Sequence, residues 1–196
     1  MEGAEYRSLV VVPKTSDVTN IEGLRGRIAA INKPHSQSGY NALRRLIADY
    51  VHMRVADDGD IPDLCGGHAY FAKVITTGSH QSSLEALAKS KANVAAIDAV
   101  SFHLIGQENP ALTDAVRLLT LTLPAPGLHL ITAHWRPDDE LQTLREALVD
   151  CLGDPKLRPA LDAMCITGFH FLDREAYAPV LEMERRAEDM GYPVLR

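Results

Sequence analysis

Short apolar runs separated by helical patterns organise the first two thirds of the chain. The runs are rich in Val, Ile, Leu and Ala and are bounded by polar residues, Gly or Pro, which is typical of strands. We predict strands at residues 6–12, 28–31, 72–76, 94–97, 117–123 and 128–132, and a further strand at 166–172. The run at 94–97 does not alternate with polar residues, which indicates a strand buried on both faces.

Apolar residues spaced three or four apart predict helices after several of these strands. The residues that carry this spacing are Tyr40, Leu43, Ile47 and Tyr50 in one helix, Leu84, Leu87 and Ala88 in a second, and Leu141, Leu144, Leu148 and Leu152 in a third. Further helices are predicted to begin at Asp154-Pro155 and at Asp173, the last one ending at Gly191. Alternation of strand and helix up to about residue 110 predicts an α/β fold with a parallel sheet.

The composition is that of a globular protein with room for one domain or two small lobes. The chain has 196 residues, 46% hydrophobic and 23% charged, and a formal charge of −6. This charge argues against nucleic-acid or acidic-membrane binding, so an anion would have to be held by local donors and dipoles. No apolar run reaches the roughly 20 residues of a membrane span. The opening MEGAEYRS shows no signal-peptide pattern, and three cysteines imply no disulfide scaffold, so the compartment stays open.

The segment of residues 27–47 reads as a strand, a polar turn and a helix that begins near Ser38. The turn is Ser36-Gln37-Ser38-Gly39-Tyr40. The first N–H groups of a helix lack internal partners, and Gly allows a ligand to approach the backbone, so this arrangement suits an anion. The alternative is an ordinary helix capped by Ser with nothing bound.

Two more polar groups follow apolar strands, namely Thr77-Gly78-Ser79-His80 and Asp98. Ligands of open parallel sheets bind at the carboxyl ends of the strands, so we expect Ser79, His80 and Asp98 to meet the Ser36–Tyr40 turn. Hydroxyl and helix N–H groups would hold an oxyanion, and His80 would donate to it. Asp98 would either orient His80 or accept from a protonated oxygen or an amine. The alternatives are Ser38, Ser82 and Asp98 as helix caps, Ser82 in a capping box with Glu85, and His80 as a turn residue.

No metal or other cofactor is predicted. The Asp- and Gly-rich segment of residues 55–67 reads as a loop, and it lacks the ligand spacing of a calcium loop. Cys65 and His68 form a lone C-x-x-H without the second pair of ligands that a zinc site needs.

An ordered set of motifs resembles the PhnD-like family, the phosphate/phosphonate-type substrate-binding proteins of ABC transporters. The motifs are YRSLVVV, GLRGRIAAINKPHSQSGYNALR, FAKVITTGSHQSSLEAL, VAAIDAV, PGLHLIT and MERRAEDMGYPVL. The resemblance implies the type 2 periplasmic-binding-protein fold, in which two α/β lobes with parallel or mixed sheets enclose the ligand. The family's Ser-x-Ser-Gly turn matches Ser36, Ser38 and Gly39, its cleft histidine matches His80, and Asp98 lies where the family has a polar cleft residue.

The resemblance also implies a division into lobes. Residues 13–122 resemble the second lobe, which carries the anion-binding turns, and residues 1–12 and 123–196 resemble the crossing segments and the remainder of the first lobe. Family chains begin with further strands and helices of the first lobe, and nothing in this sequence corresponds to them. We expect the incomplete lobe to expose apolar surface and to form a homodimer.

The sequence therefore predicts a non-enzymatic binding protein for a small oxyanion, phosphonate- or phosphate-like, with an ABC transporter permease as partner. By resemblance its location is periplasmic or membrane-associated. One alternative is a serine hydrolase that uses Ser36 or Ser79 with His80 and Asp98, although the chain has no G-x-S-x-G elbow. Another is a ligand-sensing effector domain on the same fold, although no DNA-binding pattern or basic patch is present.

Overall fold

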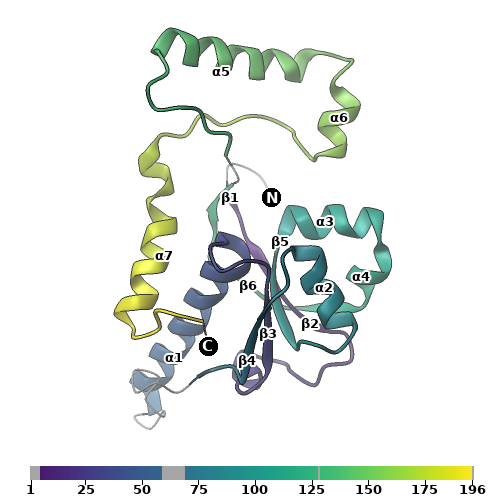
Figure 1. Cartoon of the computed structure of the whole chain (residues 1–196), viewed down its shortest axis with the longest axis vertical. Coiled ribbons are helices and arrows are strands. Elements are labelled where there is room, and N and C mark those ends of the chain that lie inside the picture. Colours follow the sequence, from purple (N-terminus) through teal and green to yellow (C-terminus); the bar gives the residue numbers. More distant parts are fainter. Residues whose placement is uncertain (1–4, 59–68, 128, 196) are drawn as a thin grey trace.

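A five-stranded mixed sheet forms the centre of the molecule (Figure 1). The computed structural model describes residues 5–58, 69–127 and 129–195. The strand order is β4-β3-β5-β2-β6. The strands are β2 (Ser8–Pro13), β3 (Ile28–Ile31), β4 (Lys73–Thr76), β5 (Val94–Asp98) and β6 (Val116–Leu121).

The sheet is parallel only in part. β3 pairs in parallel with β4 and β5, as strand–helix alternation predicts, whereas β2 is antiparallel to both β5 and β6. The predicted α/β fold with parallel or mixed sheets is therefore confirmed, and the parallel pairing expected from strand–helix alternation is confined to β3, β4 and β5. The register pairs Ser8 with Asp98, which brings the start of β2 beside the end of β5.

Helices cover both faces of the sheet because its strands are apolar on both faces. Along β2, Val10 and Val12 pack on the side of α1 (Ala42–Asp58), and Val11 packs on the opposite side. That opposite side is covered by α2 (His80–Ala88), α3 (Ala99–Glu108) and α4 (Pro110–Asp114) (Figure 1). A short 3-10 helix, η1 (Glu22–Leu24), precedes β3 and buries Leu24.

The turn after β3 enters its helix through a single π-helical turn, η2 (Gln37–Asn41), which continues as α1. The prediction of a helix starting near Ser38 is therefore confirmed within a residue. The helix runs to Asp58, so residues 55–58 are helical and not part of a loop as predicted. Residues 59–67 of that loop, together with Cys65 and His68, lie outside the described residues.

A two-stranded ribbon connects the sheet to the C-terminal helices. β1 (Glu5–Tyr6) pairs antiparallel with β7 (Ala125–Pro126). Beyond the ribbon lie α5 (Asp138–Gly153), α6 (Arg158–Ala163), the 3-10 helix η3 (Arg174–Tyr177) and α7 (Ala178–Asp189). α7 ends at Gly191 as predicted. The end is a Schellman motif, with Gly191 at φ 76° and the Tyr192 N–H donating to the Ala187 carbonyl.

Four local predictions differ from the structure. Residues 129–132 and 166–172 form no strand, and Leu128 lies outside the described residues. α6 begins at Arg158, because Asp154-Pro155 only opens a turn before it. Ser79, and not Ser82, caps α2, since its side chain accepts from the Ser82 N–H. β6 ends at Leu121, two residues before the predicted end.

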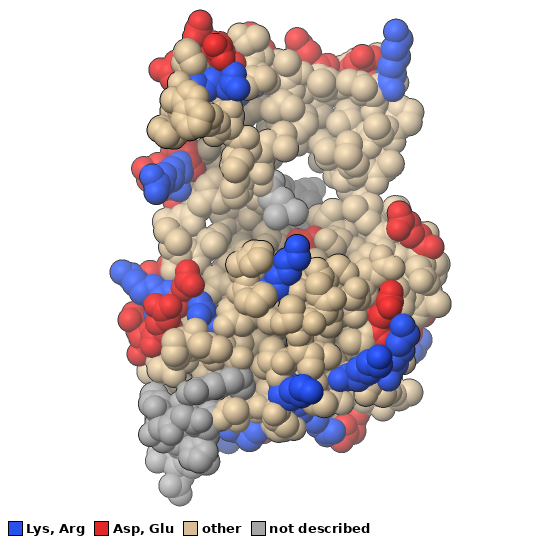
Figure 2. Space-filling model, in the orientation of Figure 1, with Lys and Arg blue, Asp and Glu red and all other residues tan. Residues whose placement is uncertain are grey.

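The part of the molecule built around α5 and α6 stands away from the sheet, with an opening between the two (Figure 2). α5 has no buried residue, and several large apolar side chains nearby are exposed. The most exposed are Leu130 at 76%, Ile131 at 83% and Trp135 at 76%. Within the part of the chain that the structure describes, the apolar segments 129–132 and 166–172 therefore have no sheet to join. Among the described residues, none of the helices combines the length and the apolar character needed to cross a membrane.

Candidate functional site

A cleft of about 660 Å³ lies at the carboxyl ends of β3, β4 and β5. This is the edge of the sheet at which ligands bind in open α/β folds. The C-terminal end of β5 points toward the part of the molecule that contains α5 and α6 (Figure 1). The cleft therefore lies at the edge of the sheet that faces those two helices. The polar residues of its lining that matter below are Tyr6, Asn32, Ser36, Ser38, Ser79 and His80.

Ser36 begins η2 and shapes the turn. Its backbone is extended, and its hydroxyl oxygen accepts from the Gly39 N–H at 3.1 Å. The capping alternative is thus realised at Ser36 and not at Ser38. Capping uses the oxygen of Ser36 as an acceptor, so its O–H is still able to donate to a ligand.

His80 opens α2 and lies against the turn. Its Nε2 is 3.0 Å from the Ser38 hydroxyl oxygen and 3.3 Å from the Asn32 Nδ2 atom. Burial lowers the pKa of His80 below its ordinary value of 6.5, while the Asp98 charge and the Ala96 carbonyl act in the opposite direction. His80 is therefore neutral at neutral pH in the empty cleft.

Asp98 ends β5 and caps α3, because its carboxylate accepts from the Ser101 N–H at 2.7 Å. The side chain is buried beside His80 and Tyr6. Burial and the Asp98 charge raise the pKa of Tyr6 to about 12. A hydrogen bond with Ser38 acts in the opposite direction and lowers this pKa. Asp98 thus combines the capping role that we gave as the alternative with an electrostatic effect on the cleft.

Not every predicted site residue faces the cleft. The Tyr40 hydroxyl accepts from the Leu195 N–H at 3.2 Å, so this ring holds the C-terminal segment. Gln37 lines the cleft but also donates to the Met183 sulfur at 3.1 Å, which ties the turn to α7. Ser79 is exposed at the cleft, and its hydroxyl donates to the Ser82 hydroxyl at 2.9 Å.

Gly39 serves a different purpose from the one predicted. A Cβ atom built there would lie 2.1 Å from the Asn32 Oδ1 atom and 3.2 Å from the His80 Cε1 atom. Asn32 and His80 therefore occupy the space that a side chain at residue 39 would need.

Among the cleft residues that sequence reasoning missed, Tyr6 and Asn32 contact predicted site residues, namely Ser38 and His80. Asn32 directly follows β3, so its place at the end of a strand was a usable signal. Tyr6 offered none, because its position depends on the ribbon β1–β7 and on the antiparallel direction of β2. The described residues contain no cluster of three or more His, Cys, Asp or Glu side chains suited to a metal ion.

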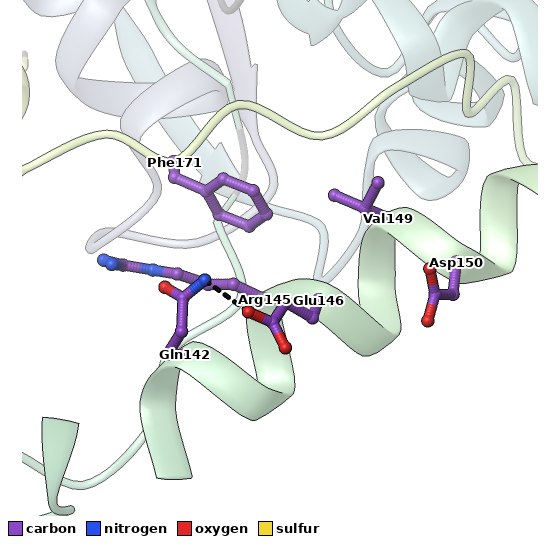
Figure 3. Close-up of a pocket in the computed structure, with 6 residues that line it drawn as sticks. All are labelled: Gln142, Arg145, Glu146, Val149, Asp150 and Phe171. Carbon is purple, nitrogen blue, oxygen red and sulfur yellow. Dashed lines mark hydrogen bonds between the residues drawn. The ribbon is translucent and has the colours of Figure 1, made fainter. Parts of the chain in front are cut away.

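A second and smaller cavity of about 280 Å³ lies along α5 (Figure 3). The Arg145 Cζ atom lies 5.6 Å from the centre of the Phe171 ring. The Gln142 Nε2 atom donates to the Glu146 Oε1 atom at 2.8 Å. Apart from Phe171, all lining residues come from this one helix. This groove on α5 offers a ligand far fewer converging groups than the first cleft does.

The sequence matches, over residues 1–177, the family described as ABC transporter, phosphonate, periplasmic substrate-binding protein. The chain belongs to this family. The predicted resemblance is therefore confirmed, and the family is one of periplasmic, non-catalytic substrate-binding proteins. The prediction that the chain is not an enzyme is confirmed on that basis.

Solved structures show the same fold. The chain is similar to a binding protein component of an ABC phosphonate transporter from Pseudomonas aeruginosa, with 16% identity and a TM-score of 0.77. It is also similar to PhnD1 from Prochlorococcus marinus (MIT 9301) in complex with methylphosphonate, with 16% identity and a TM-score of 0.73. A protein from Xanthomonas citri bound to chloride ion gives 21% identity and a TM-score of 0.67. No curated protein matches the chain significantly.

These matches include nearly all of this chain but only part of each relative. They cover 96%, 94% and 95% of this chain, and 59%, 68% and 66% of the Pseudomonas, Prochlorococcus and Xanthomonas chains, respectively. The chain thus spans about two thirds or less of the length of the solved structures that it resembles. The type 2 periplasmic-binding-protein fold is confirmed, in an incomplete form.

Proposed function

We propose that this chain binds a small phosphonate- or phosphate-like oxyanion in the cleft beside η2, as a substrate-binding component of an ABC-type uptake system. The observation that carries the proposal is the meeting of Ser36, Ser38 and His80 at the first turns of two helices, at one edge of the sheet. Helix N-termini present N–H groups and partial positive charge to an anion. The relative from Prochlorococcus marinus, which has the same fold, holds methylphosphonate.

The hydrolase alternative has the right residue types but an unsuitable arrangement. The alternative needs Ser36 or Ser79 as nucleophile, but the Ser36 hydroxyl accepts from the Gly39 N–H and the Ser79 hydroxyl donates to Ser82. The serine that is hydrogen-bonded to His80, as a nucleophile would be to its base, is Ser38. The base must in turn be oriented by a third group, and the buried His80 Nδ1 atom has no hydrogen-bond partner of normal geometry. Asp98 directs its carboxylate to the Ser101 N–H of α3. Serine as a donor to an anion fits this geometry better than serine as a nucleophile.

The first prediction concerns Ser38. At about 100 times its Kd, methylphosphonate should stabilise the protein by about 2.7 kcal/mol, which corresponds to a rise in Tm of roughly 5–10 °C. Ser38→Ala should weaken binding by about tenfold or more, because a hydrogen bond to a charged group contributes about 1.5–3 kcal/mol. Thermal shift measurements over a series of ligand concentrations give both values.

The matched control is Ser16→Ala. Ser16 is half-buried, its hydroxyl accepts from the Val18 N–H, and it follows β2 at the opposite end of the sheet from the cleft. Its removal should leave the ligand-induced shift unchanged. Equal shifts in Ser38→Ala, Ser16→Ala and the parent would show that the anion does not bind at η2.

We further propose that residues 13–122 form the second lobe, and that residues 1–12 and 123–196 form the crossing segments and the remainder of the first lobe. In support, the ribbon β1–β7 joins two distinct parts of the molecule. The five-stranded sheet, however, begins before residue 13, because it includes all of β2. A boundary within the ribbon is therefore a better dividing point than residue 13.

We also propose that the chain forms a homodimer through the exposed apolar side chains of residues 129–135 and α7. Contiguous apolar patches of this kind favour association. Ile131→Lys should shift the protein toward monomer in sedimentation experiments, because a charge would be buried at the interface. Met53→Lys, at an exposed apolar position on α1, is the control. A parent protein whose mass stays monomeric at increasing concentration would contradict the proposal.

A further inference from the structure

The hydrogen bonds around Asn32 determine which nitrogen of His80 carries the proton. The Asn32 Oδ1 atom accepts from the Lys33 N–H at 2.8 Å. A backbone N–H can only donate, so the oxygen of the amide must be the atom that faces Lys33. The Nδ2 atom therefore faces His80, at 3.3 Å from its Nε2 atom.

Since the Nδ2 group of Asn32 can only donate, the Nε2 atom of His80 must accept. The Ser38 hydroxyl, 3.0 Å from the same Nε2 atom, then also acts as a donor to it. The proton of the neutral imidazole then sits on Nδ1, the buried ring nitrogen that has no hydrogen-bond partner of normal geometry. In the empty cleft the donors of Asn32 and Ser38 are thus directed at His80.

Gly39 is what allows Asn32 to take this position. A side chain at residue 39 would overlap the Asn32 amide, since its Cβ would lie 2.1 Å from Oδ1 and 2.7 Å from Cγ. Contacts below 3.0 Å force a displacement, and the Oδ1 atom that would have to move is the one that accepts from the Lys33 N–H. Asn32, Gly39 and His80 therefore form one interlocked group.

We propose that Asn32 is a positioning residue that holds His80 as a neutral hydrogen-bond acceptor in the empty cleft, so that His80 donates to an anion only after the Asn32 amide turns away. A proton from solvent would form the Nε2–H bond of His80 and would break its hydrogen bonds from Asn32 and Ser38. Both donors would then be free to contact the anion. The anion itself rests on the function proposed above, whereas the state of the empty cleft does not.

Other charged and titratable groups surround this interlocked group. Asp98, at the end of β5, favours protonation of His80, and Tyr6 of β1 stays neutral because its pKa is raised to about 12. Lys33 and His35, between β3 and η2, and Glu108 of α3 line the same cleft. Asn32 differs from all of them, because it contacts the atom of His80 that would gain the proton.

The protonated nitrogen can be observed directly in the ligand-free protein. Long-range ¹H–¹⁵N NMR of the histidine-labelled chain distinguishes the two neutral tautomers, and His80→Asn identifies the His80 signals. At pH above the titration range we expect His80 to carry its proton on Nδ1. A proton on Nε2 would overturn the proposal.

Titration of variants tests the role of Asn32. Asn32→Ala removes a donor to the neutral ring, so the pKa of His80 should rise, and Asn32→Asp should raise it further by adding an acceptor for the Nε2–H. Gly39→Ala should shift it in the same direction by displacing the amide. Asn20→Ala, which removes a cap on the Gly23 N–H at the other end of β3, should leave it unchanged.

Unchanged titration of His80 in Asn32→Ala and Gly39→Ala would assign Asn32 a merely structural role and overturn the proposal. All of these readouts use ligand-free protein. Failure of methylphosphonate to bind the parent would therefore count against the proposed function, and it would not alter the test of Asn32.

Discussion

Arg44→Met is expected to lower the free energy of unfolding by about 2–3 kcal/mol, or the Tm by roughly 5–10 °C. Arg44 lies on α1 with only 3% of its surface exposed. Its guanidinium donates to the Pro193 carbonyl and, at 2.9 Å, to the Asn41 Oδ1 atom. It also lies 3.6 Å from Glu184 of α7, so one side chain fastens α7 and the C-terminal segment to α1. Removing it leaves the Asn41 and Pro193 acceptors without this charged donor, and hydrogen bonds to charged groups contribute about 1.5–3 kcal/mol.

The neighbouring Arg45 is the matched control. It makes an ion pair with Asp49 at 2.8 Å one turn along the same helix. Pairs of this local kind contribute about 0.3–0.5 kcal/mol, so Arg45→Met should have a much smaller effect. Urea unfolding of the two variants decides the comparison. Equal losses of stability would show that Arg44 stabilises only its own helix and does not hold the C-terminal segment.

The affinity for methylphosphonate is expected to fall as pH rises, by up to about tenfold per pH unit. Burial lowers the pKa of His80 in the empty cleft, and a bound anion would raise it by favouring the charged ring. Binding therefore takes up a proton between the two pKa values, and the loss of affinity falls in that window. Above the higher value, His80 is neutral in both states and the dependence on His80 ends.

His80→Asn separates this effect from the second ionisation of the ligand itself, because that ionisation is the same whichever protein variant binds it. The variant keeps a donor at all pH values, so the difference between its affinity and that of the parent isolates His80. His80→Ala should bind more weakly still, because neighbouring polar groups lose a partner. Calorimetry from about pH 5.5 to about pH 8.5 covers the window. Identical profiles for the parent and His80→Asn would exclude His80 as a donor to the ligand.

The same shift affects the stability of the empty protein. An unfolded chain restores the ordinary pKa of His80, near 6.5, whereas the folded protein holds it lower. The unfolded state thus binds more protons in the range between the two values. The contribution of the neutral, buried His80 to stability is complete above the ordinary pKa, and it is lost as pH falls through the lowered one.

Local patterns were sufficient for much of the fold and part of the cleft. The runs at β3 and β5 are apolar on both faces, and Asp98 follows β5 directly, so these strands and the cap of α3 could be predicted from sequence. The turn from Ser36 to Gly39 and the end of α7 at Gly191 have the residues that such ends require. Because these signals act between near neighbours, they need no knowledge of distant contacts.

Where local patterns failed, the partner lay far away in the chain or was absent. Residues 129–132 have the apolar character of a strand, but a strand needs a neighbour to accept its backbone hydrogen bonds, and the structure provides none there. Ser82 and Glu85 have the spacing of a capping box, yet Ser79 caps α2 because β4 ends early enough for the helix to begin at His80. In both cases, the local signal is necessary and not sufficient.

The sequence by itself determined the strands β3 and β5, the helix that begins at the Ser-rich turn, and the family to which the chain belongs. Only the tertiary structure decided that β2 runs antiparallel, which brings Tyr6 to the cleft, and that Tyr40 turns toward the C-terminal segment. It also decided that Asn32 meets His80, a residue 48 positions further along the chain. The physical reason is that periodicity and capping are local, whereas the direction of a side chain within a turn depends on the distant groups that pack against it.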